Sequence, residues 1–247
     1  MKISIIKEYL KNPKKNYLKF NIKYTKEELE YLDNLNINKS ITFDYYGNID
    51  KINYIKLNDF IKNIGDNENI EILCKIVQRI FTKVTKAFQT NFCWLTVRVT
   101  MPNQEYDIPR WHKDGNYFKD RKTNTFKFLT VLKGPGTLFI KKSKYMNEQY
   151  YKYLIKYRDE LNKNDIHFRK DIRDKYRKVF IGKFKDLKIN QVKTRQGLIF
   201  ITGDIRNYLK DGLLHSEPKK NVPRFFISIL PGTENEIEEH SNVHPIY

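Results

Sequence analysis

Two histidines, one aspartate and one arginine occur in an order that is typical of a metal-dependent redox site. His112 and Asp114 form a His-x-Asp motif, His215 follows about 100 residues later, and Arg224 lies nine positions after His215. Two imidazoles and one carboxylate on one face of an ion form the triad that binds Fe(II) and leaves coordination positions open. Residues i and i+2 of a strand point to the same face, so His112 and Asp114 can bind one ion together. His215 must then come from a distant strand, as a closed barrel would provide.

Length and composition favour one globular unit without a membrane partner. The chain has 247 residues, of which 40% are hydrophobic and 14% aromatic, which is enough for one sizeable core. No segment approaches the run of about 18 apolar residues that a membrane helix needs, and the N-terminus becomes charged too early for a signal peptide. Cys74 and Cys93 lie in apolar sequence and predict reduced core residues of an intracellular protein, cytoplasmic or nuclear.

The net charge of +18 has two interpretations. A strongly basic surface attracts polyanions, so nucleic acid or another acidic partner is one prediction. Lysine outnumbers arginine by about three to one, however, and Lys, Asn, Ile and Tyr are abundant together, as an A/T-rich genome would dictate. Surfaces that bind phosphate tend to use arginine. The sequence therefore leaves open whether the charge has a function.

Residues 1–92 are predicted to be a mixed, helical support region. A capping box at residues 25–28, with Thr25 as N-cap and Glu28 reaching back, opens a short helix through about Asn34. Residues 57–64 predict a second helix that Gly65 ends. The strongest helical periodicity covers residues 69–90.

After Asn91 the hydrophobic period changes from helical to the alternation typical of strands. Gly134–Thr137 predicts the tight turn of a hairpin. Residues 142–193 are rich in lysine and interrupt the strand pattern, which predicts an insertion with a helix at 146–161 and a more polar stretch after it. Asn242 and Pro245 argue against a helix in the tail, so His240 and His244 are not expected to form a metal pair. The predicted strands are 93–101, 126–132, 138–140, 197–201, 213–215 and 224–230, with residues 106–112 leading into the His-x-Asp motif.

The C-terminal two-thirds of the chain resembles the Fe(II)- and 2-oxoglutarate-dependent dioxygenases. The match consists of His112, Asp114, His215, Arg224 and the glycine-led apolar strand 197–200. It implies a mainly β fold with supporting helices, namely a double-stranded β-helix of the jelly-roll or cupin-like type. On this basis residues 1–92 pack on a core at 93–235, the helical insertion lies at 142–193, a tail follows at 236–247, and the whole forms one compact domain. The two halves of the triad are farther apart than is usual in the family.

The resemblance also implies a ligand set. His112, Asp114 and His215 are expected to bind Fe(II), and Arg224 is expected to hold the distal carboxylate of the cosubstrate 2-oxoglutarate, with ascorbate as a supporting reductant. The residues themselves add that Ser228 shares the face of Arg224 at i+4 and can donate a second hydrogen bond. A hydroxyl from another strand, with Thr130, Thr96 and Tyr106 as the candidates, can add a third.

The leading functional prediction is an oxygenase that hydroxylates, or oxidatively demethylates, its substrate with O2 and 2-oxoglutarate. The charge favours a macromolecular substrate, either a protein side chain or a nucleic-acid base. One alternative is a catalytically silent basic β-barrel that binds nucleic acid or another polyanion. Another is a cupin-like metal protein without 2-oxoglutarate chemistry. The sequence has no phosphate-binding loop, no Gly-x-Ser-x-Gly elbow and no Cys-x-x-Cys pair, and it does not indicate the oligomeric state.

Overall fold

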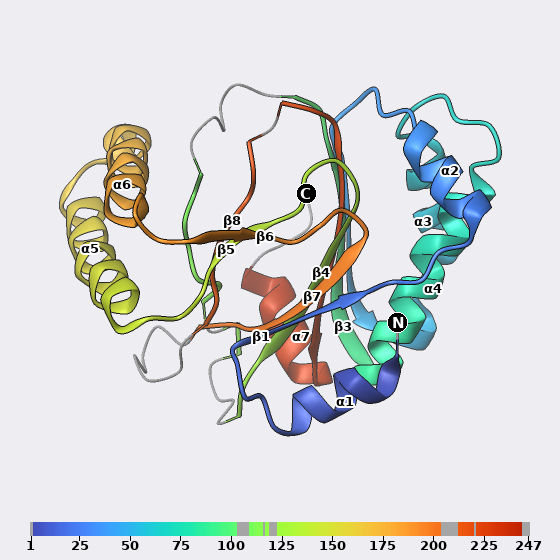
Figure 1. Ribbon diagram of the computed structural model, residues 1–247, viewed down its shortest axis with the longest axis horizontal. Helices are drawn as coiled ribbons and strands as arrows, with labels where there is room; N and C mark the ends of the chain where they lie inside the picture. Colours follow the sequence, from blue (N-terminus) through green and yellow to red (C-terminus); the bar gives the residue numbers. More distant parts are fainter. Residues whose placement is uncertain are drawn as a thin grey trace.

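Two antiparallel sheets face one another around the residues of the predicted metal site (Figure 1). The computed structural model describes residues 2–102, 109–115, 117–118, 123–203, 212–219 and 221–243. The large sheet has the order β1-β7-β4-β9-β3-β2 and the small sheet has the order β6-β5-β8. This arrangement confirms the predicted double-stranded β-helix. The strands are β1 Tyr17–Asn21, β2 Ile41–Asn48, β3 Phe92–Thr100, β4 Phe126–Lys133, β5 Leu138–Ile140, β6 Ile189–Gln191, β7 Gln196–Ile201, β8 Leu214–Ser216 and β9 Arg224–Gly232.

The large sheet separates a core from a cavity because its strands alternate between two faces. On β3, Leu95 and Val97 point outward into the main hydrophobic core, whereas Thr96 and Arg98 point inward and line a cavity. On β9, Ile227 likewise belongs to the core. The same alternation therefore stabilises the fold and supplies the polar side chains of the site.

The N-terminal region packs helices on the outer face of the large sheet (Figure 1). The predicted capping box is present, since Glu28 N donates to Thr25 Oγ1 at 3.1 Å and Thr25 N donates to Glu28 Oε2 at 2.9 Å. The region also supplies β1 and β2, the two edge strands of the large sheet, so it does more than support the barrel. Its helices are α1 Ile3–Lys11, α2 Lys26–Asn34, α3 Tyr54–Lys62 and α4 Glu71–Phe88, with a 3-10 turn at Ile49–Lys51.

The insertion is a helical hairpin that stands beyond the small sheet (Figure 1). It consists of α5 Lys144–Lys163 and α6 Arg169–Phe184, with a 3-10 turn at Ile166–Phe168 between them. The first helix was predicted, but α6 falls in the stretch that was expected to be merely polar. One hydrophobic cluster holds the hairpin together, with Tyr150 stacked on Phe180 at 5.5 Å between ring centroids, and the same cluster includes Ile140 of β5 and Leu214 of β8. In the described part of the chain, no helix, α5 included, is long and apolar enough to cross a membrane.

The expectation that the tail is not helical was wrong. Helix α7 covers Glu234–Val243 and contains His240. A second capping box starts it, because Thr233 N donates to Glu236 Oε2 at 2.8 Å and Glu236 N donates to Thr233 Oγ1. Ile237 then anchors the helix in a cluster with Leu230. His244 and Pro245 lie outside the described residues.

The turn at Gly134–Thr137 brings the start of β5 against the start of β9. Gly134 has φ +83, and a Cβ there would clash with the carbonyl of Pro223. A Cβ on Gly136 would clash with the carbonyl of Val192. Both glycines are therefore required by close backbone approach.

Replacing Gly136 should test this packing. We expect Gly136→Ala to lower the free energy of unfolding by about 1–3 kcal/mol, because the new methyl group has no space beside a rigid carbonyl. Gly182→Ala is the matched control, since a Cβ at that position on α6 meets nothing within 4 Å. It should raise the stability by up to about 1 kcal/mol through helix propensity. Urea denaturation of both variants measures the difference, and equal stabilities would contradict this account of the turn.

Candidate active site

A pair of backbone hydrogen bonds joins the two histidines of the predicted triad. His112 N donates to His215 O, and His215 N donates to His112 O, both at 2.9 Å. This isolated antiparallel bridge extends the small sheet beyond β8 by one residue pair. Side chains of directly opposed residues lie on the same face of such a pair, and the two imidazole rings are 4.3 Å apart between centroids. The predicted meeting of His112 and His215 is thus produced by the backbone.

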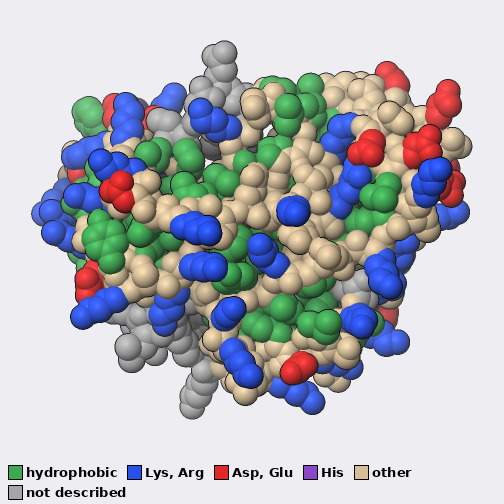
Figure 2. Space-filling model, viewed as in Figure 1, with side chains coloured by type: hydrophobic (Ala, Val, Ile, Leu, Met, Phe, Trp, Pro, Cys, Tyr) green, Lys and Arg blue, Asp and Glu red, His purple; other side chains and the backbone are tan. Residues whose placement is uncertain are grey.

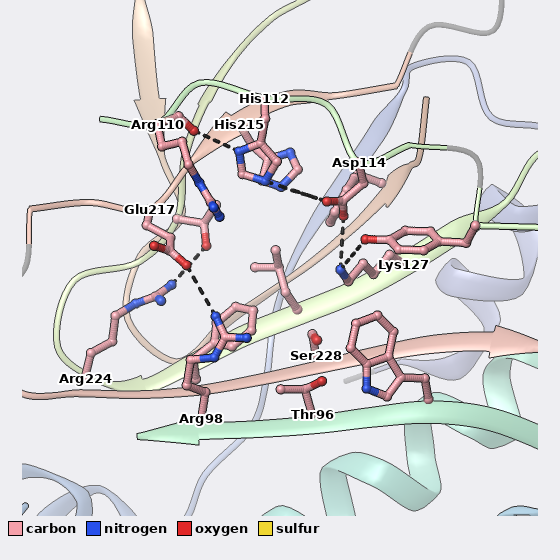
Figure 3. A pocket seen from close by; sticks show the side chains of 16 residues that line it. Thr96, Arg98, Arg110, His112, Asp114, Lys127, His215, Glu217, Arg224 and Ser228 are labelled. Carbon is pink, nitrogen blue, oxygen red and sulfur yellow. Dashed lines mark hydrogen bonds and ion pairs between the residues drawn. The ribbon is translucent and has the colours of Figure 1, made fainter. Parts of the chain in front are cut away.

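The histidine rings are oriented so that one nitrogen of each faces Asp114 (Figure 3). His112 Nδ1 bonds to Arg110 O at 2.8 Å and His215 Nδ1 bonds to Leu213 O at 3.0 Å. A carbonyl only accepts, so each Nδ1 carries the hydrogen and each Nε2 presents its lone pair. Both Nε2 atoms lie 3.7 Å from Asp114 Oδ1. The three donor atoms lie within 4.8 Å of one another, which fits the predicted binding of one divalent ion.

Burial keeps both histidines in the form that binds metals. The pKa of His112 is lowered by burial and by its neighbour His215, and the pKa of His215 is lowered mainly by burial. Both rings are therefore neutral near pH 7, so a metal ion has no proton to displace from either Nε2.

Lys127 on β4 holds the third ligand. Its ammonium lies 3.1 Å from Asp114 Oδ2 and 2.9 Å from the hydroxyl of Tyr117, and it lies over the ring of Trp94 (Figure 3). Burial opposes ionisation of Asp114, but Lys127 and the two histidines hold the pKa of the carboxyl below its usual range. Burial likewise opposes the charge on Lys127, but Asp114 and Tyr117 raise its pKa. Both groups are charged, and Asp114 Oδ1 is left directed toward the histidines.

Arg224 begins β9, where Gly134–Thr137 approaches it. Its Nε donates to Pro135 O at 3.1 Å and its Nη2 donates to Thr137 Oγ1 at 3.2 Å. The side chain also lies over the ring of Phe226. Burial lowers its pKa to about 10, so the guanidinium stays charged at neutral pH. Among the contacts of the described residues, these two bonds leave further N–H groups of Arg224 to bind a carboxylate.

The triad and Arg224 share one cavity of about 210 Å³. Its walls come from β3, β4, β7 and β9 of the large sheet and from β8 and the β5 side of the small sheet. Apolar side chains at Leu129, Phe200 and Phe226 separate the charged groups. The cavity can therefore exclude water around a small polar ligand. The other lining residues are Trp94, Thr96, Arg98, Arg110, His112, Asp114, Tyr117, Lys127, Thr137, His215, Glu217, Arg224 and Ser228.

The four hydroxyl residues that the sequence suggested for cosubstrate binding differ in position. Ser228 is buried and lines the cavity on the same face as Arg224. The geometry does not favour the predicted role of Thr130, which is absent from the described lining and donates to Gln196 O at 2.9 Å. Lys127 and Leu129 of β4 point inward, so Thr130 must point to the opposite face. Thr96 lines the cavity instead, although its hydroxyl donates to Asp44 Oδ1 at 2.6 Å. Tyr106 lies outside the described residues.

Sequence reasoning missed four charged residues of the cavity. These are Arg98, Arg110, Lys127 and Glu217. The sequence did contain a signal for Lys127. Lysine is rarely buried without a partner, so a lysine inside the apolar run of residues 126–132 indicates that one face of this strand is polar. The sequence also contained a signal for Glu217. It follows His215 at i+2, and residues at this spacing in an extended segment point to the same face.

No protein-family model matches the chain, and no curated protein is similar to it. Solved structures are similar over nearly the whole chain. The Kdo hydroxylase KdoO, a non-heme Fe(II) alpha-ketoglutarate dependent dioxygenase in complex with succinate and Fe(III), matches with a TM-score of 0.50 at 13% identity, covering 98% of this chain and 87% of that chain. This likeness shows the fold: the chain has the double-stranded β-helix of the Fe(II)- and 2-oxoglutarate-dependent oxygenases.

Two further structures are similar at lower scores. A Pseudomonas putida prolyl-4-hydroxylase matches with a TM-score of 0.41 at 7% identity, covering 94% of this chain and 99% of that chain. A dioxygenase for auxin oxidation from rice matches with a TM-score of 0.43 at 9% identity, covering 94% of this chain and 78% of that chain.

The contact between Lys127 and Asp114 predicts a weaker metal site when the lysine is lost. We expect Lys127→Met to reduce the affinity for Fe(II) or Co(II) by about 10–100-fold, the usual effect of losing a partner that orients a ligand. Lys141→Met, at an exposed position before the hairpin, is the control and should bind metal like the wild type. Isothermal titration calorimetry under anaerobic conditions measures the metal affinity of both variants. Undiminished affinity in Lys127→Met would show that Asp114 needs no support from the lysine.

Proposed function

We propose that the protein is an Fe(II)- and 2-oxoglutarate-dependent oxygenase that hydroxylates, or oxidatively demethylates, its substrate. One observation carries this proposal. The metal-binding atoms of His112, Asp114 and His215 converge in the same cavity as the buried guanidinium of Arg224. A metal triad alone fits many activities, but a triad with a fixed cation for a carboxylate fits a 2-oxo dicarboxylic acid in particular. The fold shared with Fe(II)-dependent oxygenases supports the same conclusion.

Each residue has a definite part in the proposed mechanism. His112, His215 and Asp114 would hold the iron, and Lys127 keeps Asp114 ionised and oriented. Arg224 binds the distal carboxylate of 2-oxoglutarate, with Thr137 orienting its guanidinium and Ser228 as a second donor. The chemistry that ferrous iron supplies when bound is the O2-dependent oxidation of a C–H bond, coupled to decarboxylation of 2-oxoglutarate to succinate. Leu129, Phe200 and Phe226 exclude water from that reaction.

The helical hairpin supports a macromolecular substrate, a protein side chain or a nucleic-acid base. A second cavity of about 180 Å³ lies between α5 and the triad, and it is lined by His112, Asp114, Tyr150 and Arg158 among others. Residues 141–188 contain 16 Lys and Arg against seven Asp and Glu, so they carry half of the excess positive charge of the chain. Figure 2 shows Lys and Arg side chains over the whole visible face, including the end of the molecule where the hairpin lies. An acidic macromolecule that contacts this hairpin would lie beside the iron.

The cysteines support an intracellular location, cytoplasmic or nuclear. Cys74 and Cys93 are both buried and free. A reducing compartment maintains free thiols and also ferrous iron.

Turnover of 2-oxoglutarate tests the proposed function directly. Purified protein with Fe(II), ascorbate and O2 should release succinate slowly even without a substrate, and His112→Ala should abolish this release because it removes a metal ligand. His167→Ala is the control, since His167 is exposed in the hairpin, and it should keep the wild-type rate. Succinate is quantified by mass spectrometry. Failure of the wild type to bind either Fe(II) or 2-oxoglutarate would contradict the enzyme and favour the silent, polyanion-binding barrel.

Arg224 should act on cosubstrate binding. We expect Arg224→Ala to raise the KM for 2-oxoglutarate by about 10–100-fold, the loss expected for a hydrogen-bonded ion pair of roughly 1.5–3 kcal/mol, while leaving Fe(II) affinity unchanged. Arg224→Lys keeps the positive charge but loses the planar guanidinium that can bind both carboxylate oxygens. Its KM for 2-oxoglutarate should therefore lie between those of the wild type and Arg224→Ala. If the protein is instead a cupin-like metal protein without 2-oxoglutarate chemistry, both variants should keep the activity of the wild type.

A further inference from the structure

The cavity has more positive charge than the proposed reaction uses. Its described lining contains four cationic side chains, Arg98, Arg110, Lys127 and Arg224, against the two carboxylates of Asp114 and Glu217. On the proposed function, a divalent iron and a doubly charged 2-oxoglutarate would cancel each other. Among the described lining residues, two unit positive charges therefore remain in the loaded site, and a neutral substrate gives no reason for them.

Two of the four cations already have partners deep in the cavity. Lys127 is bound to Asp114, and Arg224 is held by Pro135 and Thr137 in the position proposed for the cosubstrate. Arg98 and Arg110 are not needed for the metal or the cosubstrate. They differ from the first two in exposure, since the side chain of Arg98 is 41% exposed and Arg110 is exposed. They consequently lie at the opening, where a substrate must enter.

Glu217 is the more exposed of the two carboxylates in the described lining, with 21% of its side chain exposed against 9% for Asp114. Its Oε1 lies 3.5 Å from Arg98 Nη1, and its side chain is directed into the space that Arg98, Arg110 and Arg224 surround (Figure 3). The ion pair between Arg98 and Glu217 is long, and such a pair at a partly exposed position contributes at most about 1 kcal/mol. A ligand that offers two oxygens to an arginine fork forms stronger, charge-assisted hydrogen bonds. Such a ligand can therefore replace Glu217 at Arg98.

We propose that Arg98 and Arg110 bind an anionic group of the substrate, a carboxylate or a phosphate, and that this group displaces Glu217 from Arg98. The proposal rests on the proposed function for the place of the reacting centre. The anionic group would be held at the opening while a neighbouring carbon of the same substrate reaches past Phe226 toward His112 and His215. The site therefore selects substrates with an acidic group close to the carbon that is oxidised.

A titration with small anions tests the arginine pair. The full-length protein is loaded with Fe(II) and saturating 2-oxoglutarate under argon, so that no turnover occurs. Inorganic phosphate, acetate and acetamide are then titrated while tryptophan fluorescence is recorded, because Trp94, one of two tryptophans, lines the cavity. Phosphate and acetate should bind, and their relative affinities show which anion the site prefers. The neutral isostere acetamide should not bind.

Variants distinguish the arginine pair from the general charge of the protein. The double variant Arg98→Ala/Arg110→Ala should bind both anions at least about tenfold more weakly, as expected for losing charge-assisted hydrogen bonds. Glu217→Gln should bind them more tightly because the competing carboxylate is gone. Arg173→Ala, an exposed arginine on α6, is the control for net charge and should match the wild type. Arg98→Lys, which keeps the charge, should lie between the wild type and the double variant and protects the test against simple misfolding.

Unchanged anion affinity in the double variant, or acetamide binding as tight as acetate binding, would overturn the proposal. So would the absence of anion binding by the wild type. Failure to bind Fe(II) and 2-oxoglutarate would instead contradict the proposed function. The same anion titration without metal and cosubstrate would still decide whether the arginine pair binds anions.

Discussion

The reciprocal backbone hydrogen bonds between His112 and His215 are the constraint on which the site depends. Two proposed metal ligands that are about 100 residues apart in sequence must reach the same point, and side-chain flexibility alone could not ensure this. Because each residue donates to and accepts from the other, the backbones are fixed at the spacing of an antiparallel pair. The side chains then emerge on one face, and their Nδ1 bonds to Arg110 O and Leu213 O fix the ring orientation. Only Asp114 needs a separate support, and Lys127 provides it from the opposite sheet.

The alternation of the large sheet links this site to the stability of the protein. Placing Arg224, Lys127 and Thr96 on an inner face costs free energy, because each is a buried polar or charged group. On the outer face of the same strands, Leu95 and Ile227 belong to the large core beneath α4. That core offsets the cost of the polar face. A strand shifted by one residue would exchange the two faces, and both the core and the site would be lost. The packing of the core and the geometry of the site therefore require the same register of the large sheet.

The features with local signals could be predicted from the sequence. The capping box at Thr25, the helix that became α4 and the strand that became β4 follow from short-range patterns, and the order of the four motif residues located the site. The errors concern information that is not local. The sequence does not show which face of β4 points into the cavity, so Thr130 was a reasonable candidate. The structure shows that Lys127 and Leu129 line the cavity, and Thr130, at an odd number of positions from both, lies on the opposite face. Helix α6 has mostly charged residues, and its aromatic contacts become apparent only when it packs on α5.

The insertion explains how the triad tolerates its long separation. The hairpin leaves the small sheet after β5 and returns at β6, and Ile140 at the end of β5 pairs directly with Ile189 at the start of β6. The two ends of the insertion are therefore already neighbours in the small sheet, so the insertion is a loop that leaves the barrel and returns to the same place. The entropy of closing such a loop grows only slowly with its length, and the stacking of Tyr150 on Phe180 gives the hairpin its own source of stability. Lys113 N donates to Tyr150 OH at 3.0 Å, so the hairpin is attached to the residue between two of the proposed metal ligands. Sequence added between β5 and β6 can thus reshape the approach to the proposed iron site without moving the strands that build it.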